Sequence, residues 1–150
     1  VVTSARPDGL IDWSAGRGAD IAALGTGVVS TVMSRPEKPG GPSTPAYDVM
    51  SGTSMATPQV ASAAARCLVL DPSLTPPQVR HVLSLTCDVT ENWDGLVSSG
   101  GILNDERACA VVAANVLVSR GETPEAAVRR LPIPAGERPA VLSALSRFLG

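Results

Sequence analysis

The longest apolar stretch of the chain runs from residue 55 to residue 70, and Arg66 is its single charge. Many of its residues are alanines, which favour helix and let neighbouring elements approach closely. A helix that is apolar on every side is normally buried in a core. Pro58 would break a helix interior, so it is expected in the first turn. The pattern therefore predicts a buried helix that begins near residues 53–56 and ends before Asp71.

Short runs with β-branched residues predict strands over residues 1–5, 27–32 and 46–50. The second of these strands is expected to be half-buried. Residues 7–9, Pro-Asp-Gly, are a turn signal. Residues 34–45 contain four prolines and two adjacent glycines, which predicts a surface loop. Residues 87–95 are interpreted as a polar loop.

Helix signals follow the long apolar stretch. Thr75 is expected to cap a helix whose first turn holds two prolines. The apolar face of that helix consists of four residues at helical spacing: Val79, Val82, Leu83 and Thr86. Asn104 is expected to cap another helix that runs to about Ser119, with two acidic residues in its first turn.

The last thirty residues predict two short helices, one from about residue 124 to before Pro132 and one over about 137–148. The second carries an apolar stripe. We therefore divide the chain into residues 1–120 and a helical extension, residues 121–150. The extension is expected to pack on the rest of the chain, and binding to a partner is the alternative.

Composition excludes several classes of function. The net charge is −2 and no basic patch is present, which argues against nucleic acid as a partner. The apolar runs are too short and too rich in alanine and serine to cross a membrane. Cys67, Cys87 and Cys109 have no metal-like spacing, and the sequence shows no recognisable calcium site. No metal and no cofactor are expected. Free thiols are favoured, and a Cys67–Cys87 disulfide stays open.

Candidate chemistry lies at the start of the apolar helix, where Ser54 is expected. Free backbone N–H groups and the positive end of the helix dipole gather there. An oxyanion that forms beside Ser54 would be stabilised by that field. Gly52 allows the tight approach into the helix. The alternative interpretation is that the serine and threonine residues at 51–54 are only helix caps.

Residues 52–61 read Gly-Thr-Ser-Met-Ala-Thr-Pro-Gln-Val-Ala. This string closely resembles the nucleophile motif of the subtilisin-like serine proteases, Gly-Thr-Ser-Met-Ala-(Ser/Thr)-Pro-His-Val-Ala. Gln59 stands where histidine is usual. Residues 19–25 resemble the family segment Asp-Ile-Ala-Ala-Pro-Gly, with Leu24 in place of proline. Weaker resemblances in the family order lie at the following segments: residues 1–5, Trp13-Ser14 and residues 99–104.

The resemblance covers about residues 1–118 and implies the C-terminal part of a subtilase catalytic domain. The implied fold is α/β, with a parallel sheet and a buried central helix. The implied reaction is peptide-bond hydrolysis through an acyl-enzyme on Ser54, with Gly52, Thr53 and Met55 supporting the nucleophile and the oxyanion hole. Met50 and Tyr47 would lie on the leaving-group side, or they form ordinary hairpin packing.

A serine hydroxyl needs a general base, which in this family is a histidine that an aspartate orients. Both precede the serine in the family order, as does the oxyanion asparagine, and this chain has no histidine before Ser54. His81 is the only histidine. At 1.5 Å per residue, helix geometry leaves His81 on the order of 15 Å short of hydrogen-bond reach to Ser54. Asp8, Asp12 and Asp20 therefore have no histidine to orient.

The expected partner is thus a complementary N-terminal chain of the same precursor, and the expected substrate is a peptide or protein. The chain opens on Val1 without an initiator methionine, which favours a processed product or an excised piece. By resemblance the protein is expected to be secreted or periplasmic, with a cytoplasmic location as the alternative. Two other functions remain open: a non-catalytic subtilase-like subunit in which Ser54 is only a cap, and a sedolisin-type peptidase.

Overall fold

The computed structural model describes residues 1–12, 15–16, 18–34 and 41–150. Four short strands form one sheet in the order β1-β2-β6-β5: β1 (Val2–Ala5), β2 (Ile21–Leu24), β6 (Gly101–Ile102) and β5 (Asp88–Val89). The first three are parallel, and β5 runs antiparallel to β6. Helices pack against this sheet and against one another. The chain therefore has the α/β class that the sequence predicts.

The long apolar stretch forms helix α1 (Thr53–Leu70), which packs against β1, β2, α2 and α3. Its buried residues, Ala56, Ala63 and Cys67, lie on one stripe at helical spacing. The other side is open, and Val69 is 81% exposed. The prediction of burial on every side is therefore wrong for the described residues, because their contacts cover one face of the helix and leave the other in solvent.

Helices α2 (Pro76–Thr86) and α3 (Asp105–Ser119) begin where the sequence predicts. The backbone N–H of Thr75 donates to Gln78 Oε1 at 2.9 Å in a capping box, and Asn104 Oδ1 accepts from the backbone N–H of Arg107 at 2.9 Å. The four residues predicted to form the apolar face of α2 are buried. Local capping and periodicity were therefore sufficient to locate both helices.

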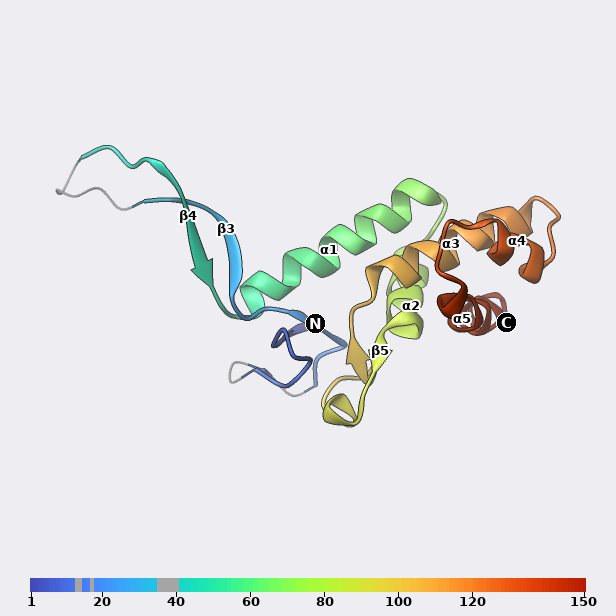
Figure 1. Cartoon of the computed structure of the whole chain (residues 1–150), viewed down its shortest axis with the longest axis horizontal. Coiled ribbons are helices and arrows are strands. Elements are labelled where there is room, and N and C mark those ends of the chain that lie inside the picture. Colours follow the sequence, from blue (N-terminus) through green and yellow to red (C-terminus); the bar gives the residue numbers. More distant parts are fainter. Residues whose placement is uncertain (13–14, 17, 35–40) are drawn as a thin grey trace.

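Helices α4 (Pro124–Arg130) and α5 (Arg138–Leu149) lie beside α3 in Figure 1. Their buried residues belong to one apolar cluster with Ala63 and Cys67 of α1 and with apolar residues of α2 and α3. Arg107 strengthens this junction, because its guanidinium pairs with Asp88 of β5 at 2.8 Å and with Glu137 at 3.0 Å. The last thirty residues therefore share a core with the rest of the described chain.

Residues 87–95 are not the polar loop that the sequence predicts. They form β5 and a 3₁₀ turn, η1 (Glu91–Trp93). The Trp93 side chain is fully buried, and its Nε1–H donates to the carbonyl oxygen of Gly9 at 2.9 Å. Burial of one large aromatic ring outweighs the polar composition of its neighbours. Trp93 thereby centres a second apolar cluster under the sheet.

Strands β3 (Val28–Met33) and β4 (Pro45–Met50) form a separate antiparallel hairpin, with Val28 opposite Met50. The hairpin projects away from the other elements (Figure 1). Within β3, Val28 and Val32 are half-buried and the other four residues are exposed, Val29 by 65%, so the prediction of a half-buried strand over residues 27–32 is wrong. Part of the predicted 34–45 loop, and the Trp13-Ser14 pair, lie outside the described residues.

All three cysteines are free, so the Cys67–Cys87 disulfide that the sequence left open does not form in the described structure. Cys67 on α1 and Cys87 are buried, and Cys109 on α3 is half-buried. Burial raises the pKa of the Cys67 thiol from an ordinary 9.0 to about 12. Burial raises the pKa of the other two thiols as well.

We expect the Cys67 thiol to make stability depend on pH. The folded protein keeps this proton up to about pH 12, whereas the unfolded thiol loses it near pH 9.0. The stabilising contribution is therefore complete below pH 9 and is lost as the pH rises from 9 towards 12. The denaturant midpoint should fall more steeply between pH 9 and pH 11 in the wild type than in Cys67→Ala. Equal slopes in the two proteins would contradict this burial.

Candidate active site

Ser54 follows a turn that lies against the end of β2. The backbone N–H of Gly52 donates to the carbonyl oxygen of Gly25 at 2.7 Å. The backbone N–H of Gly27 donates to Ser51 Oγ at 3.0 Å. These two bonds join segments that are about two dozen residues apart in sequence. The position of Ser54 therefore depends on the segment over residues 24–27 as well as on its own helix.

Gly52 is the N-cap of α1, and its φ of +143° lies in a region that L side chains rarely adopt. Its carbonyl oxygen accepts from the N–H of Met55 at 3.0 Å and from that of Ala56 at 3.4 Å. Ser54 is thus the second residue of the helix. The interpretation of Ser54 as a helix cap is therefore wrong, because the capping position belongs to Gly52 and has no side-chain hydrogen bond.

The electrostatic setting favours negative charge beside Ser54. The N–H groups of Thr53 and Ser54 precede the first intrahelical donor, which belongs to Met55. The first turn of α1 contains no acidic side chain that would offset the positive end of the helix dipole. The Ser54 side chain is exposed. An oxyanion that forms beside its hydroxyl, on the carbonyl oxygen of an attacked substrate, would therefore lie in a stabilising field.

The sequence predicts Pro58 in the first turn of α1, and this prediction is wrong: Pro58 is the sixth residue of the helix. The helix starts at Thr53 because Gly52, and not a later residue, occupies the cap. A proline at this place removes the N–H that would bond to the carbonyl oxygen of Ser54. Nearby, Thr57 Oγ1 donates to the carbonyl oxygen of Thr53 at 2.9 Å.

A cavity of about 530 Å³ opens beside Ser54. Its lining includes apolar side chains from the end of β2, from both hairpin strands and from α1: Leu24, Val28, Met50, Met55 and Pro58. Gln59 also lines it. Met50 thus shares a cavity with Ser54, whereas Tyr47 lies outside that lining on the exposed hairpin. The cavity is a place where an extended side chain could lie next to the hydroxyl.

The charged residues that the sequence singled out are engaged elsewhere. His81 lies on α2, where its ring stacks on Phe148 with centroids 6.1 Å apart. Asp12 is buried and accepts a hydrogen bond from Ser4 Oγ at 2.6 Å. Asp20 pairs with Arg80. Across residues 1–12, 15–16, 18–34 and 41–150, neither a histidine nor an aspartate other than Asp105 lines the cavity at Ser54.

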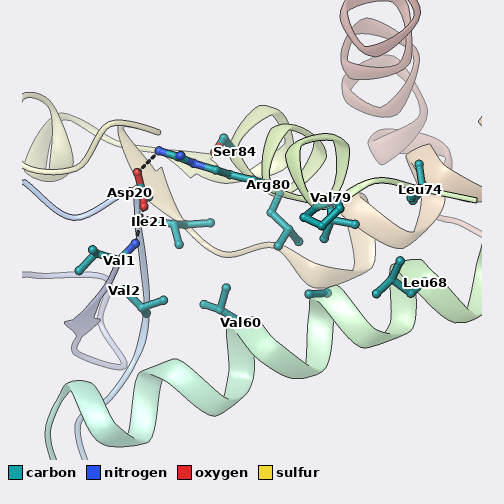
Figure 2. A pocket seen from close by; sticks show the side chains of 13 residues that line it. Val1, Val2, Asp20, Ile21, Val60, Leu68, Leu74, Val79, Arg80 and Ser84 are labelled. Carbon is teal, nitrogen blue, oxygen red and sulfur yellow. Dashed lines mark hydrogen bonds and ion pairs between the residues drawn. The ribbon is translucent and has the colours of Figure 1, made fainter. Parts of the chain in front are cut away.

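A separate apolar cavity of about 390 Å³ lies between α1, α2 and the start of β1 and β2. Figure 2 shows Val60 and Leu68 of α1 facing Val79 and Leu74 across it. Ser54 does not line this cavity. Its apolar walls stand next to β1, which is the terminal strand of the described sheet.

One contact of the site has no signal in the sequence. Gln59 Nε2 donates to the carbonyl oxygen of Leu24 at 2.5 Å. A backbone acceptor on another element cannot be predicted from residue types.

In the part of the chain that the structure describes, no cluster of three or more histidine, cysteine or acidic residues could hold a metal ion. No helix described there is both long and apolar enough to span a membrane.

Comparison with known proteins agrees with this geometry. The subtilase family (peptidase S8) matches residues 4–116. Serine protease AprX of Bacillus subtilis (strain 168) is 40% identical over 62 residues, which are 41% of this chain and 14% of that protein. A solved protease of Pseudoalteromonas arctica PAMC 21717 is similar with a TM-score of 0.63 and 27% identity, over 74% of this chain and 35% of that one. The match thus spans well under half the length of either protein, and the chain belongs to the subtilase family.

Proposed function

We propose that this chain carries the nucleophile, Ser54, of a serine endopeptidase, and that it hydrolyses peptide bonds when further polypeptide completes the site. One observation carries the proposal most directly. The exposed Ser54 is the second residue of α1, where backbone N–H groups are free and the first turn holds no acidic side chain. This is the placement that a hydroxyl nucleophile with an adjacent oxyanion site requires.

In the proposed reaction, Ser54 Oγ attacks the carbonyl carbon of the scissile peptide, and its proton passes to a histidine of the completing polypeptide. The oxyanion accepts hydrogen bonds from the Ser54 N–H and from an asparagine of that polypeptide. The C–N bond then breaks as the histidine returns the proton to the amine. Water hydrolyses the ester that remains on Ser54. Gly52 sets the turn, while Thr53 and Met55 flank the nucleophile.

We propose that the completing polypeptide is the N-terminal part of the same precursor. Its support is the surface that the described chain leaves open. β1 is the terminal strand of the sheet, and its outer edge can pair with a further strand. The apolar cavity of Figure 2 lies next to that edge, and one face of α1 is exposed. Subtilases are often secreted, so we place the activity outside the cytoplasm.

Labelling with a fluorophosphonate, which reacts with activated serines, tests this function. The probe is applied to the 150-residue chain alone and to the protein that includes the completing polypeptide, and mass spectrometry locates the adduct. We expect an adduct on Ser54 only in the second sample, because the base lies outside this chain. An intact fold without an adduct in either sample would overturn the proposal. An adduct on the isolated chain would overturn the placement of the base.

A further inference from the structure

Gln59 connects the nucleophile helix to the end of β2. Its Nε2 donates to the carbonyl oxygen of Leu24 at 2.5 Å and lies 3.4 Å from the carbonyl oxygen of Met55. An amide nitrogen carries two hydrogens, so it can serve both acceptors. Leu24 and Gln59 are also the two residues that depart from the subtilase-like motifs. The side chain of one departing residue, Gln59, therefore contacts the backbone of the other, Leu24.

The Leu24 carbonyl belongs to the segment that holds the nucleophile turn. The next residue, Gly25, accepts the hydrogen bond of the Gly52 N–H at 2.7 Å. Gly27, two residues later, donates to Ser51 Oγ at 3.0 Å. Residues 24–27 are thus bonded to α1 on one side, through Gln59, and to the turn before Ser54 on the other.

We propose that Gln59 is a positioning residue for Ser54: its amide fixes residues 24–27 against α1, and that segment fixes the Gly52 backbone two residues before the nucleophile. This inference rests on the proposed function of Ser54. The acceptor is a backbone oxygen, so the bond requires an N–H donor at position 59 and is independent of the Leu24 side chain. Gln59 itself holds no proton that the reaction needs.

Three variants of the completed protein test the proposal. Gln59→Leu removes both N–H donors and keeps a side chain of similar size. Gln59→His keeps one N–H donor. Gln78→Leu is the matched control, because it makes the same chemical change in the capping box of α2, where Gln78 Oε1 accepts from the Thr75 N–H. The control lowers stability without touching residues 24–27.

The first measurement is the rate of Ser54 labelling as a function of fluorophosphonate concentration. Loss of the Gln59 hydrogen bond to the segment that holds the nucleophile turn should lower the maximal rate about tenfold in Gln59→Leu, with the half-saturating concentration unchanged. Gln59→His should recover most of the rate, and Gln78→Leu should keep it. An equal loss in Gln78→Leu would mean that lowered stability is the cause and would overturn the proposal.

The second measurement is amide hydrogen exchange at Gly52, which does not depend on the reactivity of Ser54. In Gln59→Leu the Gly52 amide should exchange about tenfold faster, while amides in the middle of α1 keep their rates. Unchanged exchange at Gly52 would overturn the proposed role of Gln59. An unreactive Ser54 in the wild-type protein would instead overturn the proposed function, so the two failures are distinguishable.

Discussion

The Ser54→Ala variant is expected to lose fluorophosphonate labelling and to lower the peptidase kcat/KM of the completed protein by on the order of 10⁴-fold or more. The reason is chemical, because alanine has no oxygen that can form the acyl-enzyme. The fold should not change, since the Ser54 side chain is exposed and does not cap α1. Its free energy of unfolding should stay within about 0.5 kcal/mol of the wild type.

Ser146→Ala is the matched control for this loss. Ser146 also lies on a helix, α5, and its hydroxyl donates to the carbonyl oxygen of Leu142 at 3.0 Å. It is not among the residues that line the cavity at Ser54. This control should retain full labelling and full kcat/KM on a peptide substrate. Appreciable peptidase activity in Ser54→Ala would show that another residue is the nucleophile.

Gly25→Ala should produce the largest loss of stability among the variants considered. A Cβ at position 25 would lie 2.2 Å from Ser4 Oγ and 2.7 Å from the carbonyl oxygen of Gly52. Ser4 cannot move aside easily, because it is buried and donates to the buried Asp12. Overpacking of this kind costs about 3 kcal/mol. Displacement of the turn should also lower kcat/KM by about 10²-fold in the folded fraction.

Gly136→Ala provides the comparison for Gly25→Ala. A Cβ at position 136 would meet no atom within 4 Å, so its free energy of unfolding should change by about 0.5 kcal/mol or less. Denaturant unfolding gives the stabilities, and kcat/KM is then measured where each protein is fully folded. Wild-type stability of Gly25→Ala would contradict the close approach of the two backbones.

Elements with local signals could be predicted from the sequence. Thr75 and Asn104 cap their helices as expected, and the periodicity of α2 identifies its buried face. These signals depend on residues within one or two turns of each other. The start of α1 was also located, although its glycine cap placed Pro58 further inside the helix than expected.

Features that depend on distant parts of the chain could not be predicted. The apolar composition of α1 predicts that the helix can be buried. Which face is covered depends on the elements that pack against it, and these come from distant parts of the chain. The hairpin pattern fits a half-buried ribbon, yet the hairpin stands clear of the other described elements. Trp93 lies in a polar sequence context, and its burial depends on distant residues: an apolar cluster that includes Ala5 and Ala22, and a hydrogen bond to the Gly9 carbonyl oxygen.

The candidate site also contains features with local sequence signals and features that depend on distant residues. Ser54 could be proposed as the nucleophile from sequence because its neighbours form one contiguous string at the start of a helix. The contacts of Gly25 with Gly52 and of Gln59 with Leu24 join residues far apart in sequence through backbone atoms. Every residue type has a backbone carbonyl oxygen, so a sequence motif does not show which carbonyl accepts these hydrogen bonds. The sequence therefore predicts Ser54 as the nucleophile and marks residues 19–25 as a family-like segment, but it does not predict the hydrogen bonds that join them.

The hydrogen bond from Gln59 has a consequence for how related chains are found in genomes. A search pattern that demands histidine after the Thr57-Pro58 pair rejects this sequence at that position. Glutamine and histidine both carry an N–H donor, which is what the Leu24 carbonyl accepts. A pattern that admits either residue there would retain chains of this kind, because both residue types keep an N–H donor at that position.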